Sequence, residues 1–554
     1  MDWVAACQAL WRGRDGLTVF DADYGGGAAF RALRQAWQND VQRSARLHYI
    51  ALAGDPLPGF RRLPQERAAV TLDLLSAPLD DALGQLQARL DIIVLRGDRI
   101  DGHRFAHALG KLARPGALLY AQALTRAQSA ALVHAGFVFS EPGRAVYASR
   151  RPQPAAAAVR QRRAIVVGAG LAGSAACERL CARGWQVTLV ERHPQPACEA
   201  SGNLAGICMP LLSRDDNLMT RLARAAFRYA LDYWETLGAD GPGMRCGVLQ
   251  LARDSAHAEV QRAIAAGRAY PPEFAQWLEA PAASAMLGTS APDGAWLFPL
   301  GGWVRPLDLC GAMLTACGDN LVRRFGAGSV SIGDADGMWQ VCDAQGALLA
   351  QAPVLILANG NGATSLPQAA HLPLASVRGQ VTYLAAGQAP DLPFVLCREA
   401  YLTPAQNGVH SLGASYDDDN DPALRSTSQT ENLNKVGAML GGPVLGAGAA
   451  LAGRVGFRSV APDRLPLVGA LPQALDGAGR IERLRDVPRQ PGLFGLLGYA
   501  SRGLAWAPLA AELLAAQLDG EALPLEAELV QALDPARFVL REQRKASVAG
   551  RSKV

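Results

Sequence analysis

Short apolar runs alternate along the chain with glycine turns and amphipathic stretches, a pattern typical of an α/β fold with parallel strands. The clearest case lies between Arg162 and Glu191. The run Ala164–Val167 has the length and β-branched content of a buried strand, Ser174–Arg183 keeps apolar residues at helical spacing, and Val187–Val190 predicts a second strand. We therefore predict a βαβ unit whose second strand ends at Glu191.

A glycine-rich turn, GAGLAG at residues 168–173, joins the first strand of this unit to its helix. Gly168 allows the tight turn, Gly170 lets the backbone approach a pyrophosphate, and Gly173 lets the helix lie close to the strand. Glu191 follows where a carboxylate can bind ribose hydroxyls. Such a turn also occurs without a ligand, but strand, helix and acid in register favour a dinucleotide site. The acid disfavours NADP, and this unit alone does not decide between FAD and NAD.

Residues 1–150 carry a second α/β pattern. A glycine loop at residues 25–27 follows a short strand and precedes a helix at Ala28–Trp37. The predicted strands are Leu17–Phe20, Leu47–Leu52, Asp91–Leu95, Gly116–Ala121 and Val146–Ser149. This is the outline of a class I methyltransferase, in which the loop holds S-adenosylmethionine. A Rossmann-like domain without chemistry fits equally well, because no acid directly ends the second strand.

Three stretches differ in composition from the rest. Residues 151–163 are rich in proline, alanine and arginine and are predicted to form a linker. Residues 541–554 form a basic tail that is predicted to be disordered. The acidic segment 416–422, YDDDNDP, lacks the glycine and the final glutamate of an EF-hand and is predicted to be a solvated turn.

The dinucleotide fold does not continue without interruption after Glu191. The further predicted elements are helices at Arg221–Leu237, Pro306–Cys317 and Ala507–Leu518, and strands at Val354–Leu357, Gly379–Leu384, Val409–Ala414, Gly453–Arg458 and Leu493–Gly498. A nicotinamide dehydrogenase usually keeps this fold contiguous, so a long β-rich insertion favours a flavoprotein. We expect cofactor-binding parts at about residues 164–246, 300–376 and 455–540, with substrate-binding parts between them.

Length, charge and composition restrict the possible classes of protein but do not identify a function. A chain of 554 residues is too long for one core and predicts two or three domains. A net charge of +4 permits a nucleic-acid partner without requiring one. The N-terminus does not resemble a signal peptide. No apolar run is long enough for a membrane span. The ten cysteines are scattered and form no CxxC pair, which predicts a protein of the reducing cytoplasm. Cys177 with Cys181 and His103 with His107 show no third ligand, so we expect no metal site.

Several segments together resemble a known family. They are IVVGAGLAGSAAC, ASGNLAGICMP, ASVRGQVTYL, GRVGFRSVAPDRLPLVGALP, GYASRGLAWAPLAAELLAAQLDGEALPL and LDPARF. Residues 162 to about 540 are similar to the D-amino-acid-oxidase-type (DAO) FAD oxidoreductases, and more closely to the oxidoreductase half of the bacterial bifunctional tRNA 5-methylaminomethyl-2-thiouridine biosynthesis family, MnmC. The resemblance implies FAD as cofactor, tRNA as partner, and an α/β fold class. It implies a Rossmann-like methyltransferase-type domain at residues 1–150, and at 164–540 a DAO-type FAD domain with an inserted β-rich α+β substrate domain.

The resemblance also implies a reaction. The family oxidises 5-carboxymethylaminomethyl-uridine at the tRNA wobble position to 5-aminomethyl-uridine, and the group removed is an N-linked glycine unit. A fixed guanidinium suits its carboxylate because it binds two oxygens at once. The candidate catalytic residues are Arg458, Arg502, Arg378 and Tyr499, of which each arginine could instead form a structural ion pair. The residues expected to contact FAD are Gly168, Gly170, Leu171, Ala172, Gly173, Glu191, Arg192, Ser201, Gly202, Asn203, Gly206, Asn359, Gly360, Gly498, Ser501 and Gly503.

The front half departs from the family pattern. The family's glycine loop resembles GFGTGLNF, whereas this chain has Asp23–Phe30, DYGGGAAF. The acid of the family's LDGFAP falls on Arg96, and the family's N-terminal segment is mostly absent. We predict that residues 1–150 keep the fold, lose S-adenosylmethionine-dependent methyl transfer, and act within a monomer. A free glycine- or sarcosine-type oxidase and a non-catalytic tRNA-binding flavoprotein are the alternative functions.

Overall fold

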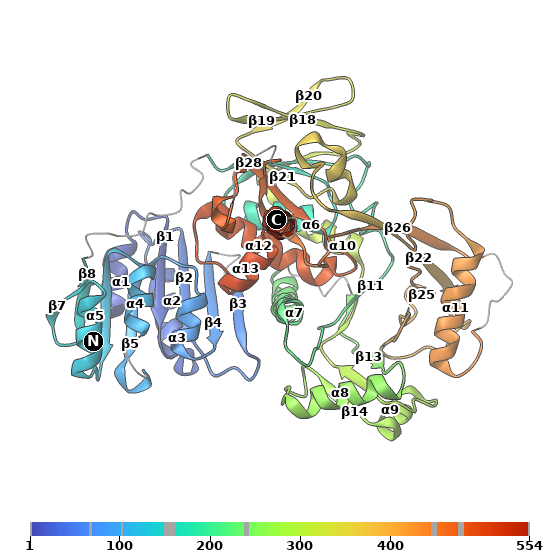
Figure 1. Ribbon diagram of the computed structural model, residues 1–554, viewed down its shortest axis with the longest axis horizontal. Helices are drawn as coiled ribbons and strands as arrows, with labels where there is room; N and C mark the ends of the chain where they lie inside the picture. Colours follow the sequence, from blue (N-terminus) through green and yellow to red (C-terminus); the bar gives the residue numbers. More distant parts are fainter. Residues whose placement is uncertain are drawn as a thin grey trace. The chain divides into compact units, whose positions relative to one another are not determined.

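The computed structural model describes residues 3–65, 69–100, 104–148, 161–237, 243–444, 451–474 and 481–551 (Figure 1). The chain forms two compact units. The first comprises Met1–Gln161, Leu231–Thr236 and Glu512–Val530, and the second comprises the remaining residues. Most of the predicted linker, residues 151–160, lies outside the described residues. The domain boundaries at residues 150 and 164 stay predictions.

The first unit is built on an eight-stranded sheet with the order β3-β4-β2-β1-β5-β6-β8-β7. The strands are β1 (Gly16–Asp21), β2 (Arg46–Leu52), β3 (Gly59–Gln65), β4 (Val70–Ser76), β5 (Leu90–Arg96), β6 (Ala113–Gln122), β7 (Phe137–Glu141) and β8 (Arg144–Tyr147). The helices are α1 (Trp3–Trp11), α2 (Ala28–Asn39), α3 (Leu79–Gln85), α4 (Phe105–Leu112) and α5 (Arg126–His134). The five strands from β4 to β6 pair in parallel, and apolar cores cover both faces. The Rossmann-like prediction is confirmed.

Strand β3 was not predicted because its sequence, GFRRLPQ, has no apolar alternation. Its Arg62 is nevertheless fully buried. The guanidinium donates to Asp73 Oδ1 and Oδ2 at 2.7 Å each and to Glu512 Oε1 at 2.9 Å. Local hydrophobic periodicity does not reveal this ion pair, because Asp73 and Glu512 lie elsewhere in the chain.

The dinucleotide sheet lies in the second unit and has the order β17-β10-β9-β21-β28-β27. Its strands are β9 (Arg163–Val167), β10 (Gln186–Val190), β17 (Leu321–Arg324), β21 (Val354–Leu357), β27 (Leu467–Pro472) and β28 (Arg489–Leu497). The predicted βαβ unit is confirmed as β9, α6 (Leu171–Cys181) and β10, with β9 and β10 parallel. Strand β21 pairs with β9 on one side and β28 on the other. The sheet is therefore assembled from segments far apart in sequence.

A second eight-stranded sheet, the substrate sheet, has the order β14-β15-β13-β23-β24-β25-β22-β26. Its strands are β13 (Val248–Leu251), β14 (Gln276–Leu278), β15 (Ala295–Phe298), β22 (Ala375–Ala385), β23 (Val395–Cys397), β24 (Tyr401–Leu402), β25 (Val409–Gly413) and β26 (Gly453–Val460). Helix α11 (Ser426–Leu440) packs on one face of β22 and β25 through Leu433, Val436 and Met439 (Figure 1). The predicted β-rich insertion is confirmed.

The remaining elements complete the second unit or cross between units. They are β11 (Gly206–Cys208), β12 (Gly243–Met244), β16 (Gly302–Val304), β18 (Ser331–Ala335), β19 (Met338–Cys342), β20 (Leu348–Ala352), α7 (Leu218–Thr236), α8 (Ser255–Gly267), α9 (Ala280–Leu287), α10 (Pro306–Ala316), α12 (Gly503–Asp519), α13 (Ala527–Leu533) and α14 (Arg537–Arg551).

The prediction of a disordered tail from residue 541 is wrong for the described part, because α14 continues to Arg551. Phe538 packs in the core beside the dinucleotide sheet, and Arg541 pairs with Asp463 at 2.6 Å. These contacts hold the start of the helix, which the basic composition did not indicate.

Candidate functional site

The turn between β9 and α6 shows which of its glycines serve packing and which serves a ligand. Gly168 has a φ of +104°, and a Cβ there would lie 2.7 Å from the carbonyl oxygen of Ala358. A Cβ on Gly173 would lie 1.8 Å from the carbonyl oxygen of Gly168, so the helix could not approach the turn. A Cβ on Gly170 would meet only the Ser201 hydroxyl at 3.0 Å. Gly170 is thus the glycine that leaves open space at the helix N-terminus, next to Leu171 and the buried Ala172.

Glu191 is held at the tip of β10 by two backbone amides. Its Oε2 accepts from Ala169 N at 2.6 Å and its Oε1 from His193 N at 2.9 Å. Carboxylate oxygens carry further lone pairs, so both remain able to accept from ribose hydroxyls. This position at the end of a strand beside the glycine turn is the one expected for a dinucleotide's ribose.

The end of β21 lies on the other side of the same turn. Gly168 packs against Asn359, and Asn359 Oδ1 is buried without a hydrogen-bond partner among the described residues. Gly360 has a φ of +54°, and the exposed Arg192 guanidinium lies 3.4 Å from where a Cβ of Gly362 would be. An unpaired buried acceptor is costly unless a ligand donor satisfies it.

The loop ASGN, residues 200–203, connects the glycine turn to the substrate sheet. Ser201 Oγ accepts from the Leu171 amide at 3.2 Å. Arg454 of β26 donates to the carbonyl oxygens of Cys198 and Glu199, and its guanidinium lies against Gly202 and reaches Asn203 Oδ1 at 3.4 Å. A Cβ on Gly202 would be 2.4 Å from Arg454, so this glycine is required.

The C-terminal segment closes the site from residues more than 300 positions later in the sequence than the glycine turn. Gly498 turns the chain with a φ of +74°, Ser501 is exposed, and Gly503 begins α12 beside Leu171, 3.4 Å from a Cβ built on it. Leu504 fills the space that a side chain on Gly206 would need. The two halves of the predicted FAD set are thereby brought together.

Buried donors in this region test whether the residues fit FAD. Tyr499 Oη, Trp506 Nε1 and Trp303 Nε1 are buried and have no hydrogen-bond partner among the described residues. Burial raises the pKa of Tyr499 well above its usual range, so the hydroxyl stays protonated at neutral pH. Unpaired donors near a helix N-terminus, with an anchored carboxylate at the ribose position, fit a cofactor that carries phosphates, hydroxyls and ring acceptors. The residues present therefore fit FAD.

Arg458 lies on the face of the substrate sheet opposite α11. Along β26, Arg454, Gly456 and Arg458 alternate onto one face, and Gly456 approaches Ala200 of the ASGN loop. The Arg458 guanidinium crosses over Gly379, whose Cβ would be 2.1 Å from Nη1. That nitrogen donates to two carbonyl oxygens, of Arg378 and Ser415, at 3.3 Å each.

Arg458 has no carboxylate partner within 4.0 Å among the described residues. Burial lowers the pKa of its guanidinium, an effect that Tyr416, Tyr401 and Asp417 oppose. A half-buried cation without an ion pair is suited to an anionic ligand. This is the environment that the carboxylate-binding hypothesis requires.

Arg502, between Gly498 and α12, is the second such cation. It is half-buried, and none of the described residues forms a side-chain hydrogen bond or ion pair with it. Burial and, after it, the charge of Arg464 lower the pKa of the Arg502 guanidinium. Arg502 is therefore a second half-buried cation, immediately before α12, that is suited to an anionic ligand.

Arg378 lies in a different environment. It is fully buried on the α11 side of β22, and all three guanidinium nitrogens donate within the protein. Nε donates to Asp421 O at 2.8 Å, Nη1 to Asp417 Oδ2 at 2.9 Å, and Nη2 to Gln380 Oε1 at 3.0 Å and Ala423 O at 2.6 Å. With four of its five N–H groups donating within the protein, Arg378 is placed to hold a loop rather than a substrate.

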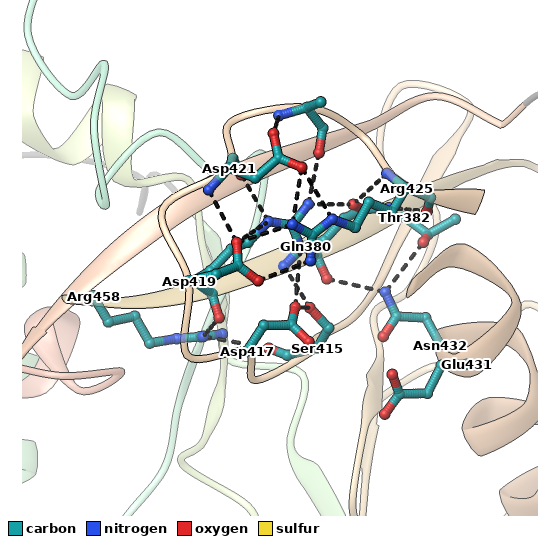
Figure 2. A network of polar contacts seen from close by, with 12 residues as sticks. Gln380, Thr382, Ser415, Asp417, Asp419, Asp421, Arg425, Glu431, Asn432 and Arg458 are labelled. Atoms are coloured by element: carbon teal, nitrogen blue, oxygen red, sulfur yellow. Dashed lines mark hydrogen bonds and ion pairs between the residues drawn. The ribbon is translucent and has the colours of Figure 1, made fainter. Parts of the chain in front are cut away.

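That loop is the acidic segment predicted to be a solvated turn. Asp419 and Asp421 are partly exposed, at 38% and 42%, but their carboxylates and that of Asp417 are paired with arginines. Asp419 and Asp421 both receive hydrogen bonds from Arg425, at 2.8–3.1 Å, while Asp417 accepts from Arg378 and from Ser415 Oγ (Figure 2). The carboxylates are charge partners of arginines that lie 4 to 39 residues away. Local composition shows the acids but not which cations the sheet brings to them.

Replacing Arg378 with leucine is expected to lower the stability of the substrate sheet by about 3 kcal/mol, because Asp417 and two carbonyl oxygens lose their donors. The matched change Lys435→Ala removes an exposed pair with Glu431 on α11 and is expected to cost less than about 0.5 kcal/mol. Thermal unfolding followed by circular dichroism measures both. Equal midpoints for the two variants would show that the network does not stabilise the fold.

Sequence analysis missed two tyrosines beside Arg458. Tyr401 of β24 lies on the same sheet face, and burial raises its pKa to about 12, an effect that the nearby Ser411 side chain partly offsets. The ring of Tyr416 lies 5.0 Å from the Arg458 guanidinium carbon. Strand parity could have indicated Tyr401, but Tyr416 depends on the loop path.

The glycine loop of the first unit differs from the intact dinucleotide turn. Gly25, Gly26 and Gly27 all have positive φ, and a Cβ on Gly27 would be 2.5 Å from the Tyr24 hydroxyl. The Arg96 guanidinium pairs with Asp23 at 3.4 Å. The Arg96 side chain therefore lies against the loop itself.

Two further searches cover only the residues that the structure describes. None of those helices combines the length and apolarity needed to cross a bilayer. No group of three or more histidine, cysteine or acidic side chains is arranged to bind a metal ion in the same part of the chain.

Comparisons with known proteins come from sequence and from structure. The DAO family, FAD dependent oxidoreductase, matches residues 163–517. The tRNA 5-methylaminomethyl-2-thiouridine biosynthesis bifunctional protein MnmC of Azoarcus sp. (strain BH72) is 43% identical, with 96% of this chain and 92% of that protein covered. Its counterpart from Burkholderia thailandensis is 39% identical, with 97% and 92% covered.

Among solved structures, glycine oxidase from Geobacillus kaustophilus covers 68% of this chain and 99% of its own, with a TM-score of 0.55 and 21% identity. Iminodiacetate oxidase from Chelativorans sp. BNC1 covers 65% and 96%, with a TM-score of 0.54 and 24% identity. At these identities the likeness is one of fold.

Proposed function

The chain belongs to the MnmC family and carries its DAO-type FAD-dependent oxidoreductase, and on this basis we propose that it acts on tRNA. The substrate is the wobble nucleotide 5-carboxymethylaminomethyl-(2-thio)uridine, and the product is 5-aminomethyl-(2-thio)uridine. The observation that carries the proposal is the Arg458 guanidinium. It has no carboxylate partner among the described residues, and it lies on the sheet face that contacts the cofactor loop. A carboxylate on the substrate's glycine unit would supply the missing anion.

FAD, when bound, supplies the acceptor for the hydride of the glycine unit's CH₂ group. The amine loses its proton, a C=N bond forms on the substrate, and addition of water releases glyoxylate and the primary amine. The chain's residues position the reactants. Glu191 would hold the ribose, the N-terminus of α6 at Gly170 the pyrophosphate, and Arg458 and Arg502 the carboxylate. Tyr401 stays protonated at neutral pH and can donate to the same carboxylate.

The test uses purified protein and tRNA that carries the carboxymethylaminomethyl group. We expect a yellow protein that releases one glyoxylate per modified nucleotide, with 5-aminomethyl-uridine identified by nucleoside mass analysis. Absence of a flavin spectrum would contradict the proposal. Turnover of free sarcosine with none on tRNA would instead identify a free amino-acid oxidase.

We also propose that residues 1–150 have kept the methyltransferase-type fold without methyl transfer. The pair between Arg96 and Asp23 supports this, because a cation at the family's acidic position now lies against the glycine loop. The Tyr24 hydroxyl supports it too, since it occupies the space beside Gly27. The substrate amine and S-adenosylmethionine would both lie close to the positive charge of Arg96 at this loop.

With S-adenosylmethionine added to the same reaction, we expect no 5-methylaminomethyl-uridine. Calorimetry should detect no binding of the cofactor to the full chain. Methylated product in the mass analysis would overturn this part while leaving the oxidoreductase proposal intact.

A further inference from the structure

We propose that the exposed ring of Tyr416 is a stacking platform for the uracil base of the wobble nucleotide. The inference rests on the proposed function, because it assumes a nucleotide substrate. Tyr416 is 58% exposed and is the one aromatic residue among the large apolar side chains that are exposed in the described part of the chain. The ring lies beside Arg458, the cation proposed to bind the substrate's carboxylate, so the base of a bound substrate can cover it.

The alternation of side chains along the strand places the Tyr416 ring on the sheet face that carries Arg458. Asp417 forms an antiparallel bridge with Arg378, so the side chain of Asp417 points to the α11 side of the sheet. Its neighbour Tyr416 therefore points to the opposite face, where Arg458 lies. The guanidinium carbon of Arg458 is 5.0 Å from the centre of the ring. This cation–π contact between the guanidinium and the Tyr416 ring also holds Arg458 in place.

The loop that carries Tyr416 is fixed by charge pairs on both sides (Figure 2). Ser415 Oγ donates to Asp417 Oδ2 at 2.7 Å, and Gln380 N donates to Ser415 Oγ at 3.1 Å. Arg425 holds Asp419 and Asp421, as described above. A ring on a fixed loop loses little conformational freedom when a base stacks on it. The arginines also offset acidic charge that would otherwise repel tRNA phosphates.

The chemistry of the substrate matches this geometry. The glycine unit is attached to the uracil ring, so a carboxylate bound at Arg458 brings that ring close to the neighbouring side chains. A wobble base must leave the anticodon stack to present its substituent to an enclosed cofactor. An aromatic platform compensates for the stacking that is lost, and base–aromatic stacking is sequence-tolerant.

The experiment is a double-mutant cycle on the FAD-containing full-length protein. One change is Tyr416→Leu. The other is removal of the base from the wobble nucleotide of an anticodon stem–loop RNA. Equilibrium binding of the uridine and abasic RNAs is measured for both proteins. We expect the wild-type protein to prefer the uridine RNA by about 5- to 150-fold, the range for one stacked base, and Tyr416→Leu to lose that preference. Tyr416→Phe should keep it.

Leu424→Ala is the matched control, because Leu424 is an exposed apolar residue, 48% exposed, close to the same loop. It should bind both RNAs as the wild-type protein does, and flavin spectra verify that every variant keeps its cofactor. An equal preference in wild type and Tyr416→Leu, or no preference in wild type, would overturn the inference. Glyoxylate release from modified tRNA by the wild-type protein is measured in parallel. Its absence would overturn the proposed function instead.

Discussion

Replacement of Arg458 by leucine is expected to slow flavin reduction by modified tRNA by about 30- to 5000-fold while FAD stays bound. The range corresponds to the roughly 2–5 kcal/mol lost when one partner of a buried, hydrogen-bonded charge pair is truncated. Arg458 contributes no ion pair to the described fold, so its removal should leave the apoprotein intact. Anaerobic stopped-flow absorbance of the flavin measures the rate, and the visible spectrum measures FAD content.

Arg262→Leu is the matched control. Arg262 also lies over an aromatic ring, 6.0 Å from the centre of Trp277, but it is paired with Glu279 and lies outside the site. Its removal should leave flavin reduction unchanged. A wild-type rate in Arg458→Leu with a large loss in Arg502→Leu would move the carboxylate anchor to Arg502. Wild-type rates in both variants would contradict a guanidinium anchor altogether.

The second large effect separates two glycines of one motif. Gly170→Ala is expected to weaken FAD binding by about 5- to 150-fold, or about 1–3 kcal/mol, because the new methyl occupies the pyrophosphate side of the turn. The fold should persist, since among the described residues the added Cβ would meet only the Ser201 side chain, whose hydroxyl oxygen is 3.0 Å away. Gly173→Ala is expected to destabilise the dinucleotide domain by more than about 3 kcal/mol, because its Cβ would lie 1.8 Å from a backbone oxygen.

Flavin titration and thermal unfolding of the apoproteins distinguish the two outcomes. Gly311→Ala in α10 is the control, because nothing lies within 4 Å of its added Cβ. A helical glycine with open space should tolerate alanine or gain up to about 1 kcal/mol. If Gly170→Ala unfolds as readily as Gly173→Ala, the assignment of Gly170 to the ligand is wrong.

The dinucleotide unit could be predicted from sequence because it depends on features that lie close together in the chain. Strand β9, helix α6 and Glu191 follow from apolar periodicity and from glycines whose roles are steric. The polar pairs that hold β3 and the acidic segment could not be predicted in this way. Arg62 pairs with residues 11 and 450 positions away, and the acidic residues at 417–421 pair with arginines 4 to 39 positions away.

The candidate arginines show the same limit of prediction from sequence at the level of single residues. Arg378 and Arg458 both lie in motifs of the substrate sheet, and composition does not distinguish them. In the fold, one strand position decides which face of the sheet receives each side chain. Arg378 falls on the face covered by α11, whereas Arg458 falls on the open one. Pairing register, which a single sequence does not reveal, separates a structural cation from one available to a ligand.

The dinucleotide sheet also sets an order of events during synthesis. Its central strand β9 ends at Val167, but β28, on the far side of β21, ends at Leu497. At roughly 5–20 residues per second, the ribosome needs about 15–70 s to make the intervening chain. For that time the βαβ unit has neither its full sheet nor the start of α12. The predicted FAD-binding set, which includes Gly503, is therefore complete only near the end of translation, and a nascent chain released before β28 would leave the apolar edge of β21 exposed to other chains.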